Sequence, residues 1–393
     1  MDNIQNTLYL TTPGTYVARD HLTLLVKVPL RPDGRPATAD DLQTGVSNWK
    51  SVSIPIHHLE SICAFGPITI TAAALDLCWE HGIAVNFHTE NGYLQARMVG
   101  VADTSVTLRR VQFRVADQPD RCAAIARQII AGKLQNARNS LLRAARETDQ
   151  TDTKALLGEA NDSLARLIED LARWQPADFC RPGALDALRG VEGMGTALYF
   201  NAFNGLLKQQ RDHFALTSRS RRPPRDRINC LLSFLYALVR HDCIAALTSI
   251  GLDPFVGFLH TLRPNRPALA LDLMEEFRPW LADRLAVTLI NRQQVQPHDF
   301  LCARRHKNRL REKINRQQVQ PHDFLCREGG AVELTGNGRK RIIAAYQERK
   351  QEVLTHPLLQ QECRIGQLPF LQARLLARHL RGDLPDYLPF VPK

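Results

Sequence analysis

The sequence lacks the cysteine spacing that a structural zinc cluster or a disulfide framework requires. Its nine cysteines are dispersed, and none forms a Cys-x-x-Cys pair. No apolar run approaches the roughly 20 residues that cross a bilayer. The first ten residues also lack the basic and then apolar pattern of a secretory signal. These absences predict reduced thiols and a cytoplasmic protein without a membrane partner.

The composition excludes a mainly disordered or collagen-like chain. Of 393 residues, 44% are hydrophobic and 23% are charged, which is the balance of a globular protein with a sizeable core. The length suits two domains. The net charge is +11, but residues 1–110 hold 8 basic and 10 acidic residues, whereas the remainder holds 43 and 30. A positive excess confined to the second segment favours a polyanion such as nucleic acid as partner, with solubility alone as an equally weighted alternative.

Hydrophobic periodicity predicts an α+β fold. Eight short strand-like runs punctuated by turn sequences begin at TLYL, the sixth being TITAAA at 69–74, and one helix, AALDLCWEHG, ends at Gly82. From about residue 118 apolar residues recur every three or four positions, and RINCLLSFLYALVRHDCIAALTSIG reads as a buried central helix. We therefore expect a β-rich N-terminal domain over 1–110 and a larger, mostly α-helical domain over 111–393.

One segment is duplicated. INRQQVQPHDFLC occurs at 290–302 and again, letter for letter, at 314–326. Solenoid repeats diverge and occur several times, so a local tandem duplication, or an error in the sequence, explains the pair better. The intervening ARRHKNRLREK is basic. It either touches a phosphate backbone or forms a solvated surface loop, and the loop is the favoured interpretation.

Two residues are weak candidates when taken alone. Glu192 lies between Gly190 and Gly193 in LRGVEGMGTALYF, where glycines permit a close approach of backbone or ligand. A glutamate near a helix start also suits the helix dipole, and this structural interpretation is favoured for Glu192 in isolation. His260 ends the apolar stretch GLDPFVGFLHT. A lone histidine of this kind is more often a structural residue than a ligand.

A cluster of acids in LALDLMEEFRP, residues 269–279, is a stronger candidate. Asp272 and Glu275 are three positions apart and share a helix face, and Glu276 lies nearby. Close like charges are costly unless a cation or hydrogen bonds offset them. Because apolar residues surround the acids, the segment predicts a site for a hard divalent cation such as Mg²⁺ or Mn²⁺. A solvated acidic turn is the alternative.

Basic residues accompany these acids, as phosphodiester chemistry requires. RSRRPPRDR at 219–227 contains five arginines and one acid, and two further arginines stand between His260 and the acidic segment. Cations hold a nucleic-acid backbone while a metal stabilises charge on the transferring phosphate. The candidate DNA-binding residues are Arg219, Arg221, Arg222, Arg225, Arg263 and Arg266.

The ordered motifs resemble the CRISPR-associated Cas-one integrase family. They are RGVEGMGTALYF, RRPPRDRINCLLSFLYALV, GLDPFVGFLHT, LALDLMEEFRP and INRQQVQPHDF followed by REGGAVELTGNGRK. The resemblance covers nearly the whole chain, including IIAGKLQNARNSLLR, and the closing RIGQLPFLQARLLARHLRGDLPDYLPF resembles subtype I-C members. Members of the family carry one copy of INRQQVQPHDF, so the duplication near 290–326 is a departure. We expect it to form a disordered or looped excursion that leaves the site intact.

The resemblance implies a site and partners. It places the metal ligands on Glu192, His260 and Glu275, with Asp272 as a supporting acid, although some members carry Asp where Glu275 stands. It implies Mg²⁺ or Mn²⁺, a homodimer whose β-rich domain makes the dimer and partner contacts, and a complex with a Cas-two dimer. The subtype makes a Cas-four nuclease a further candidate partner.

The resemblance also implies a reaction, the insertion of protospacer DNA into the CRISPR repeat. A 3′-hydroxyl of the protospacer attacks a phosphodiester of the repeat, so the chain is expected to be a metal-dependent endonuclease and integrase. A purely hydrolytic metal-dependent nuclease is one alternative, because the same metal site serves water as nucleophile. A DNA-binding scaffold without catalysis is the other.

Overall fold

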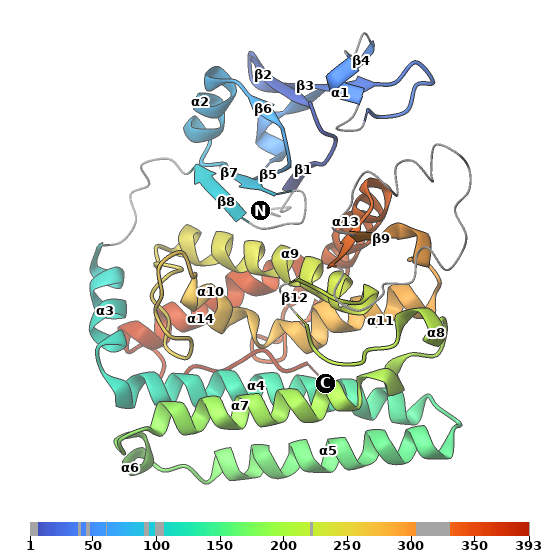
Figure 1. Ribbon diagram of the computed structural model, residues 1–393. Coiled ribbons are helices and arrows are strands. Elements are labelled where there is room, and N and C mark those ends of the chain that lie inside the picture. Colours follow the sequence, from blue (N-terminus) through green and yellow to red (C-terminus); the bar gives the residue numbers. More distant parts are fainter. Residues whose placement is uncertain are drawn as a thin grey trace. The chain divides into compact units, whose positions relative to one another are not determined.

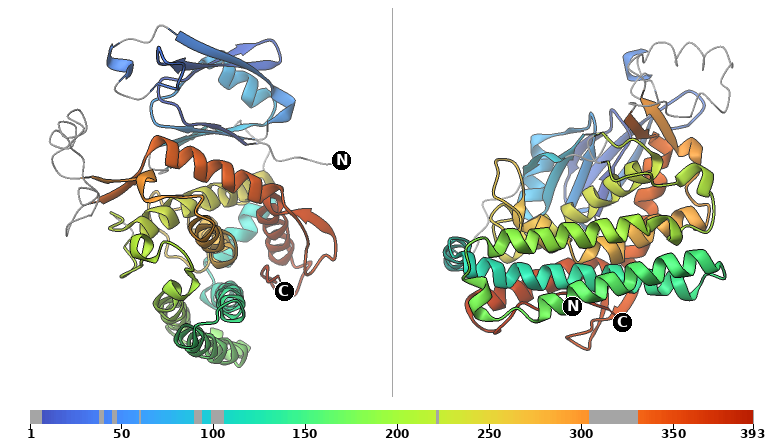
Figure 2. Two further views of the ribbon diagram at one scale, coloured as in Figure 1. Left: turned by 90° about the vertical axis from the view of Figure 1, so that its right-hand side faces the viewer. Right: turned by 60° about the horizontal axis from the view of Figure 1, so that its bottom comes forward.

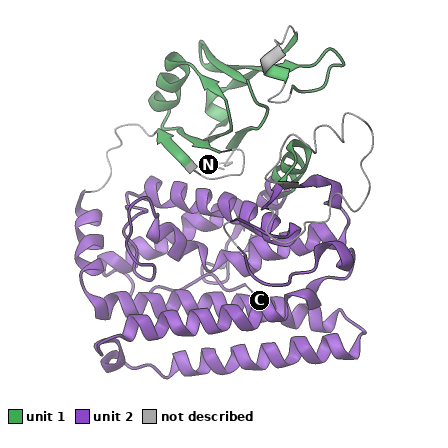
Figure 3. Ribbon diagram, in the orientation of Figure 1, with its two compact units in different colours: residues 1–103, 334–345 green, residues 104–333, 346–393 purple. Residues whose placement is uncertain are grey.

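The computed structural model describes residues 7–37, 41–44, 48–59, 61–89, 94–98, 106–220, 223–303 and 331–392. The chain divides into two compact units, drawn in different colours in Figure 3. The first comprises Met1–Asp103 with Leu334–Ala345, and the second comprises Thr104–Glu333 with Tyr346–Lys393. The first is rich in strands and the second is mostly helical, which confirms the predicted α+β class.

Two four-stranded sheets form the first unit. One has the order β1 (Thr7–Leu10), β5 (Ser61–Phe65), β7 (Ala84–His88) and β8 (Leu94–Met98), parallel except for β8. The other has the order β4 (Asn48–Pro55), β3 (Thr23–Leu30), β2 (Tyr16–Asp20) and β6 (Thr69–Ile70). The short helices α1 (Asp41–Thr44) and α2 (Ala72–Glu80) complete it. Alternate strand residues such as Val17, Leu24 and Ile62 join Leu77 of α2 in one buried core.

The predicted strand TITAAA is wrong after Ile70, where the chain turns into α2. Thr71 caps this helix, because its side-chain oxygen accepts a hydrogen bond from the Ala74 amide at 3.3 Å. Alanine favours helix once such a cap is present. At the other end Gly82 adopts a φ of +69°, as the sequence predicts for a helix stop.

Helices dominate the second unit. They are α3 (Val106–Ala116), α4 (Pro119–Arg146), α5 (Thr151–Ala172), α6 (Pro176–Phe179), α7 (Ala184–Asn201), α8 (Arg211–Phe214), α9 (Arg227–Ile250), α10 (Ala268–Met274), α11 (Arg284–Asn291) and α14 (Leu368–Arg381). The division between the units falls within α13 (Gly336–Gln351). Two short ribbons pair β9 (Phe300–Ala303) with β10 (Ala331–Leu334) and β11 (Val353–Thr355) with β12 (Glu362–Arg364).

Three long helices form one side of the second unit. In Figures 1 and 2, α4, α5 and α7 run side by side, and their extensive mutual packing agrees with this arrangement. The bounds of α4 match the amphipathic pattern predicted from residue 118 onward. Pro119 occupies its first turn, where the missing amide hydrogen costs nothing. This layer places the buried face of α4 next to α7, and both helices contribute to the site described below.

The apolar helix α9 is the central helix of the second unit, as predicted. Its 24 residues are long and apolar enough to cross a membrane by length and composition alone. However, 72% of its most apolar window is buried inside the protein, as in the core helix of a globular domain. Asp226 caps its start by accepting from the Asn229 amide at 2.6 Å, and Gly251 ends it at a φ of +91°.

The first copy of the duplicated segment is packed into the second unit. Val295 is fully buried, and the Phe300 ring meets Phe214 edge to face at a centroid distance of 5.6 Å. The Asn291 side chain accepts from the Lys208 amide at 2.7 Å and donates to the Leu206 carbonyl at 3.0 Å. The first copy therefore serves the fold, whereas the second copy and the expected looped excursion lie outside the described residues.

Candidate metal centre

The structure brings Glu192 and Glu275 together on one ammonium group and places His260 beside Glu275. Glu192 lies on α7, His260 in the loop between α9 and α10, and Glu275 at the end of α10. The Lys133 ammonium of α4 forms ion pairs with Glu192 Oε1 and, at 2.8 Å, with Glu275 Oε2. His260 Nε2 lies 3.6 Å from Glu275 Oε1. Four segments that are distant in sequence thus converge on two carboxylates, an imidazole and a lysine.

Glu275 is an ionised carboxylate in a buried position. Its side chain is 1% exposed. The Arg278 guanidinium lies 2.9 Å from Oε1, the oxygen opposite the one that Lys133 contacts. Burial by itself would raise the pKa of Glu275, but the charges of Arg278, Lys133 and His260 outweigh burial and hold the pKa at about 2. The carboxylate therefore keeps its negative charge at neutral pH, as a metal ligand must.

Asp272 holds the loop that carries His260. Its buried carboxylate accepts backbone hydrogen bonds from Phe258 at 2.6 Å, Leu259 at 3.0 Å and His260 at 2.9 Å. It also contacts His260 Nδ1 at 2.7 Å. Because a carboxylate only accepts, this contact assigns a proton to Nδ1, and Nε2 is the ring nitrogen that faces Glu275. A carboxylate behind the other ring nitrogen is the usual support of a metal-binding histidine.

Glu276 faces away from this cluster. Its oxygens accept from the Tyr387 hydroxyl, the Phe390 amide and, at 3.1 Å, the Gln372 side-chain amide. Burial raises the pKa of Glu276 to about 8, although these hydrogen bonds act against the rise. Glu276, Glu275 and Asp272 are all buried, so the alternative of a solvated acidic turn is wrong. Asp272 and Glu275 both contact His260, whereas Glu276 has other partners, so the three acids do not form one cluster.

The sequence interpretation missed Lys133. It sits in IIAGKLQNAR, in a helix whose neighbouring positions Ile129, Ile130 and Leu134 are buried, and it is itself 6% exposed. A lysine on the apolar face of an amphipathic helix is the signal that could have found it, because a buried cation requires an anionic partner.

No other part of the described chain closely approaches the glycines next to Glu192. Apart from their own helix, no atom of the described residues lies within 4 Å of a Cβ at Gly190 or Gly193. Gly195, one turn further on, is the glycine that packing requires, since its Cβ would lie 2.2 Å from Leu134. Gly257 is equally constrained, because a Cβ there would lie 2.7 Å from both Asp272 Oδ2 and the Ala268 carbonyl carbon. These two glycines allow α7 and the His260 loop to approach their neighbours.

The donor set suits a hard divalent cation, although the side chains are not arranged around a vacant coordination site. Within the described ranges, no three His, Cys, Asp or Glu side chains are grouped to hold a metal ion. The Lys133 ammonium explains this, because it occupies the position between Glu192 and Glu275. Its 2.8 Å contact with Glu275 Oε2 lacks hydrogen-bond geometry. The two carboxylates therefore attract a cation to this position by charge.

A cluster of arginines flanks the His260 loop. Arg263 is exposed and Arg266 is partly buried. Burial, followed by the charge of Arg263, lowers the pKa of Arg266, and Arg189 and Arg278 act in the same direction. Arg189, which the sequence interpretation did not single out, donates to the Leu259 carbonyl at 2.8 Å. Positive charges are therefore crowded beside the carboxylates.

The other predicted DNA-binding residues are placed differently. The Arg219 guanidinium lies 5.1 Å from the Phe200 ring centroid and 5.3 Å from that of Tyr236, and it donates to Asn229 Oδ1. It therefore packs the end of α7 against α9. Arg225 is exposed and can reach a ligand. Arg221 and Arg222 lie outside the described residues.

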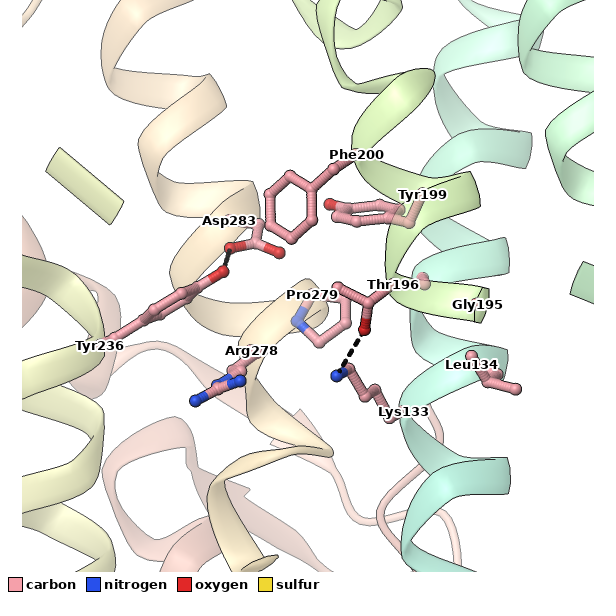
Figure 4. Close-up of a pocket in the computed structure, with 11 residues that line it drawn as sticks. Lys133, Leu134, Gly195, Thr196, Tyr199, Phe200, Tyr236, Arg278, Pro279 and Asp283 are labelled. Atoms are coloured by element: carbon pink, nitrogen blue, oxygen red, sulfur yellow. Dashed lines mark hydrogen bonds between the residues drawn. The ribbon is translucent and has the colours of Figure 1, made fainter. Parts of the chain in front are cut away.

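A small cavity adjoins Lys133 (Figure 4). Its volume is about 20 Å³, and its polar lining includes Thr196, Tyr236 and Asp283. Asp283 Oδ1 accepts from the Tyr236 hydroxyl at 2.6 Å. Burial raises the pKa of Asp283 to about 6, although this hydrogen bond and three nearby cations oppose the rise.

We expect Asp283→Asn to stabilise the protein at alkaline pH. Because the pKa of Asp283 is higher in the folded chain than its ordinary 3.8, the buried carboxylate costs little below about pH 4. The loss in free energy of unfolding grows between about pH 4 and pH 6 and levels off above that, at no more than about 3 kcal/mol. Urea unfolding of both proteins at pH 4.5 and pH 8 should show the larger gain at pH 8. A gain that is equal at both values would contradict the assignment.

Known proteins match this chain over its full length. The sequence family described as CRISPR associated protein Cas1 (Cas-one) matches residues 8–313. A CRISPR-associated endonuclease Cas1 of Moorella thermoacetica is 41% identical over 391 residues, which are 100% of this chain and 99% of that protein. One from Rhodospirillum rubrum is 39% identical and covers 99% of both chains. A Cas4 exonuclease/Cas1 endonuclease fusion of Geobacter sulfurreducens is 31% identical over 98% of this chain and 60% of the fusion.

Solved structures share the fold. A Cas1 protein from Thermotoga maritima matches with a TM-score of 0.70 and 20% identity, over 99% of this chain and 100% of that one. A casposase bound to its integration product matches with a TM-score of 0.73 and 20% identity, over 98% and 93%. A chain of a Cas6-RT-Cas1–Cas2 complex matches with a TM-score of 0.71 and 22% identity, over 98% of this chain and 36% of that one. Agreement in fold, together with the sequence matches, confirms the resemblance: the chain belongs to the CRISPR associated protein Cas1 family.

Proposed function

We propose that this chain is a metal-dependent DNA endonuclease and integrase of CRISPR adaptation, which inserts protospacer DNA into the CRISPR repeat. The observation that carries the proposal is that Glu192 and Glu275 share one cation, with His260 beside Glu275 and with Arg263 and Arg266 nearby. An anionic site that accepts a metal inside a basic surface is what phosphodiester transesterification needs. The full-length relatives named as CRISPR-associated endonucleases support the same chemistry.

In this proposal Glu192, Glu275 and the Nε2 atom of His260 hold Mg²⁺ or Mn²⁺. The bound ion supplies charge stabilisation at the scissile phosphate and favours the deprotonated 3′-oxygen. Asp272 keeps His260 in the tautomer whose Nε2 is free to bind. Arg263 and Arg266 hold the phosphates on either side, contacts that fix the position of the DNA without reading its sequence.

We further propose partners and a subtype. The closing RIGQLPFLQARLLARHLRGDLPDYLPF supports subtype I-C. A similar fold in a Cas6-RT-Cas1–Cas2 complex and a fusion of Cas4 with Cas1 support a Cas2 dimer and a Cas4 nuclease as partners. We place the protein in the cytoplasm as a homodimer in which residues 1–110 make the dimer and partner contacts and residues 111–393 bind DNA. The free thiols of the described cysteines suit that compartment.

An integration assay tests the proposal. Short duplex DNA with 3′-hydroxyl ends is incubated with a supercoiled plasmid that carries a repeat, in Mn²⁺ or Mg²⁺, with and without Cas2. Joined products are expected from the wild type and none from Glu192→Gln or in EDTA. Glu159→Gln, on the neighbouring helix α5, is the matched control because its side chain is exposed.

Three results would redirect the proposal. Nicking without joining would favour the hydrolytic nuclease, in which water replaces the 3′-hydroxyl. Binding of DNA without either reaction would favour the scaffold. Joining that survives both Glu192→Gln and EDTA would mean that the active site lies elsewhere.

We predict that replacing Arg263 and Arg266 with alanine flattens the salt dependence of DNA binding. Each lost phosphate contact removes close to one unit from the slope of log affinity against log salt concentration. The pair should therefore lower the slope by roughly 1–2 units. Fluorescence anisotropy with a labelled duplex at several salt concentrations measures the slope. The double variant Arg143→Ala and Arg173→Ala removes two exposed arginines that are engaged in local ion pairs, and it should leave the slope nearer that of wild type.

A further inference from the structure

The Lys133 ammonium lies between the carboxylates of Glu192 and Glu275 and neutralises both. Its ammonium contacts Glu192 Oε1 and Glu275 Oε2, and it donates to the Thr196 hydroxyl at 2.9 Å. The Thr196 hydroxyl in turn donates to Glu192 Oε1 at 2.9 Å. Lys133 is 6% exposed, so its charge depends on these partners rather than on water.

The charges of the site balance without any further ion. The two carboxylates of Glu192 and Glu275 face two fixed cations, Lys133 and Arg278. The Asp272 carboxylate is already engaged by three backbone amides and His260. A divalent cation bound between Glu192 and Glu275 would therefore add two positive charges next to an ammonium. Like charges at such distances repel strongly in a buried site, so a bound dication and the ammonium cannot share this position.

The cavity beside Lys133 offers the ammonium a second position. A volume of roughly 10–15 Å³ holds one water molecule, which is about the size of an ammonium group, and this cavity has about 20 Å³. Lys133 and Asp283 both line this cavity, and Figure 4 shows them on different helices that face it. Asp283 lies in the π-helical turn η3 (Arg278–Asp283) and has Tyr236 as a hydrogen-bond partner. The charge of Lys133 is already among those that lower the pKa of Asp283.

We propose that Lys133 is an exchangeable internal cation: it neutralises Glu192 and Glu275 until a divalent cation binds, and its ammonium then moves into the cavity and pairs with Asp283. The inference rests on the proposed metal centre and deepens it. Metal binding then exchanges one cation for another, so that the negative charges of Glu192 and Glu275 are neutralised both before and after the metal binds. Thr196 lines the same cavity and contacts the ammonium now, so it is a partner that both positions can share.

A double-mutant cycle on metal affinity tests the exchange. Isothermal titration calorimetry with Mn²⁺ alone measures the dissociation constant of wild type, Lys133→Met, Asp283→Asn and the combined variant, without DNA. Lys133→Met removes the competitor, so its Kd is expected to fall at least tenfold. Asp283→Asn removes the second partner of the ammonium, so its Kd is expected to rise at least threefold. In the Lys133→Met background Asp283→Asn should have no effect, because no ammonium remains to be moved.

Controls separate this exchange from a change of net charge and from failure of the metal centre. Lys208→Met removes an exposed lysine that pairs with Glu147, and its Kd should equal that of wild type. Glu192→Gln should abolish binding. If wild type shows no binding that depends on Glu192, the metal centre and the exchange fail together.

Two outcomes overturn the exchange alone. The first is Glu192-dependent binding in wild type with an unchanged or weaker affinity in Lys133→Met. The second is an Asp283→Asn effect of equal size in both backgrounds, which would show that Asp283 acts on the metal without Lys133. Should Lys133→Met fail to fold, Lys133→Gln, which retains a polar side chain for Thr196, takes its place in the cycle.

Discussion

Replacing Asp272 by asparagine is expected to weaken Glu192-dependent Mn²⁺ binding by about 10–100-fold and to unfold the protein at markedly lower urea concentration. The carboxylate accepts four hydrogen bonds, three from the backbone of residues 258–260 and one from the His260 ring. An amide offers one oxygen, and its NH₂ group would face amides that also donate. Breaking a buried and charged network of this kind costs about 3–5 kcal/mol.

The loss should extend to the metal centre, because Asp272 is the group that positions His260. Altering the carboxylate behind a ligand histidine reduces metal affinity by about 10–100-fold. Asp253→Asn is the matched control. Asp253 lies in the same loop, and its side chain accepts a hydrogen bond from the Phe255 amide at 2.8 Å. It should cost less than about 1.5 kcal/mol and leave Mn²⁺ affinity unchanged. Equal effects of the two variants would show that Asp272 has no special role.

Gly257→Ala provides an independent test of the same loop. A Cβ at this position would lie within 3 Å of the backbone of α10 as well as of Asp272, so the loop has to move away. We therefore expect Gly257→Ala to reproduce the loss of Mn²⁺ affinity while every ligand and Asp272 remain present. This expectation follows from packing alone and does not depend on the charge of Asp272.

The elements that local sequence determines were predicted well. The helices α4 and α9 carry their own signals, a regular apolar stripe in the first case and an Asp cap with a terminal glycine in the second. The strand predicted beyond Ile70 failed because the cap supplied by Thr71 outweighed the alternating pattern. Such competition between two local signals is decided by hydrogen bonds that the sequence pattern does not display.

The candidate site was less accessible to local patterns. Asp272 and Glu275 face the two nitrogens of the His260 ring. Glu276 points about 100° away from Glu275 and faces Tyr387 instead, because consecutive residues of a helix point that far apart. Weighed alone, Glu192 and His260 were assigned structural roles, and only the family resemblance joined them to Glu275. Lys133 escaped notice because its partners come from α7 and α10, distant in sequence. The assignment of the metal ligands stays a prediction that the integration and binding experiments test.

Glu276 connects the candidate metal centre to the C-terminal tail. It follows Glu275 directly and accepts from the Phe390 amide and the Tyr387 hydroxyl. From the other side, the buried Asn136 of α4 donates to the Glu276 carbonyl and the Phe390 carbonyl, both at 2.8 Å. The tail thus fixes the backbone at the end of α10 where Glu275 must be held. Its stability and that of the site should therefore change together.

Replacing Phe390 by alanine is accordingly expected to destabilise the second unit by about 3–5 kcal/mol. Phe390 has no exposed surface, and its ring meets Phe277 at 5.9 Å and Trp280 at 5.0 Å between centroids. The cavity left by the ring would also loosen the hydrogen bond from its amide to Glu276, so Mn²⁺ affinity should fall with stability. Urea unfolding and calorimetry measure the two effects in the same preparation.

Leu388→Ala is the matched control for Phe390→Ala. Leu388 lies two residues away in the same tail and is 44% exposed, so its truncation should cost less than about 1 kcal/mol. If Phe390→Ala destabilised the protein as expected but left Mn²⁺ affinity intact, the tail would be a part of the core that does not position Glu275. If stability and Mn²⁺ affinity both fell only in Phe390→Ala, the segment that holds Tyr387 and Phe390 would act on the metal centre through Glu276, which is not one of the proposed ligands.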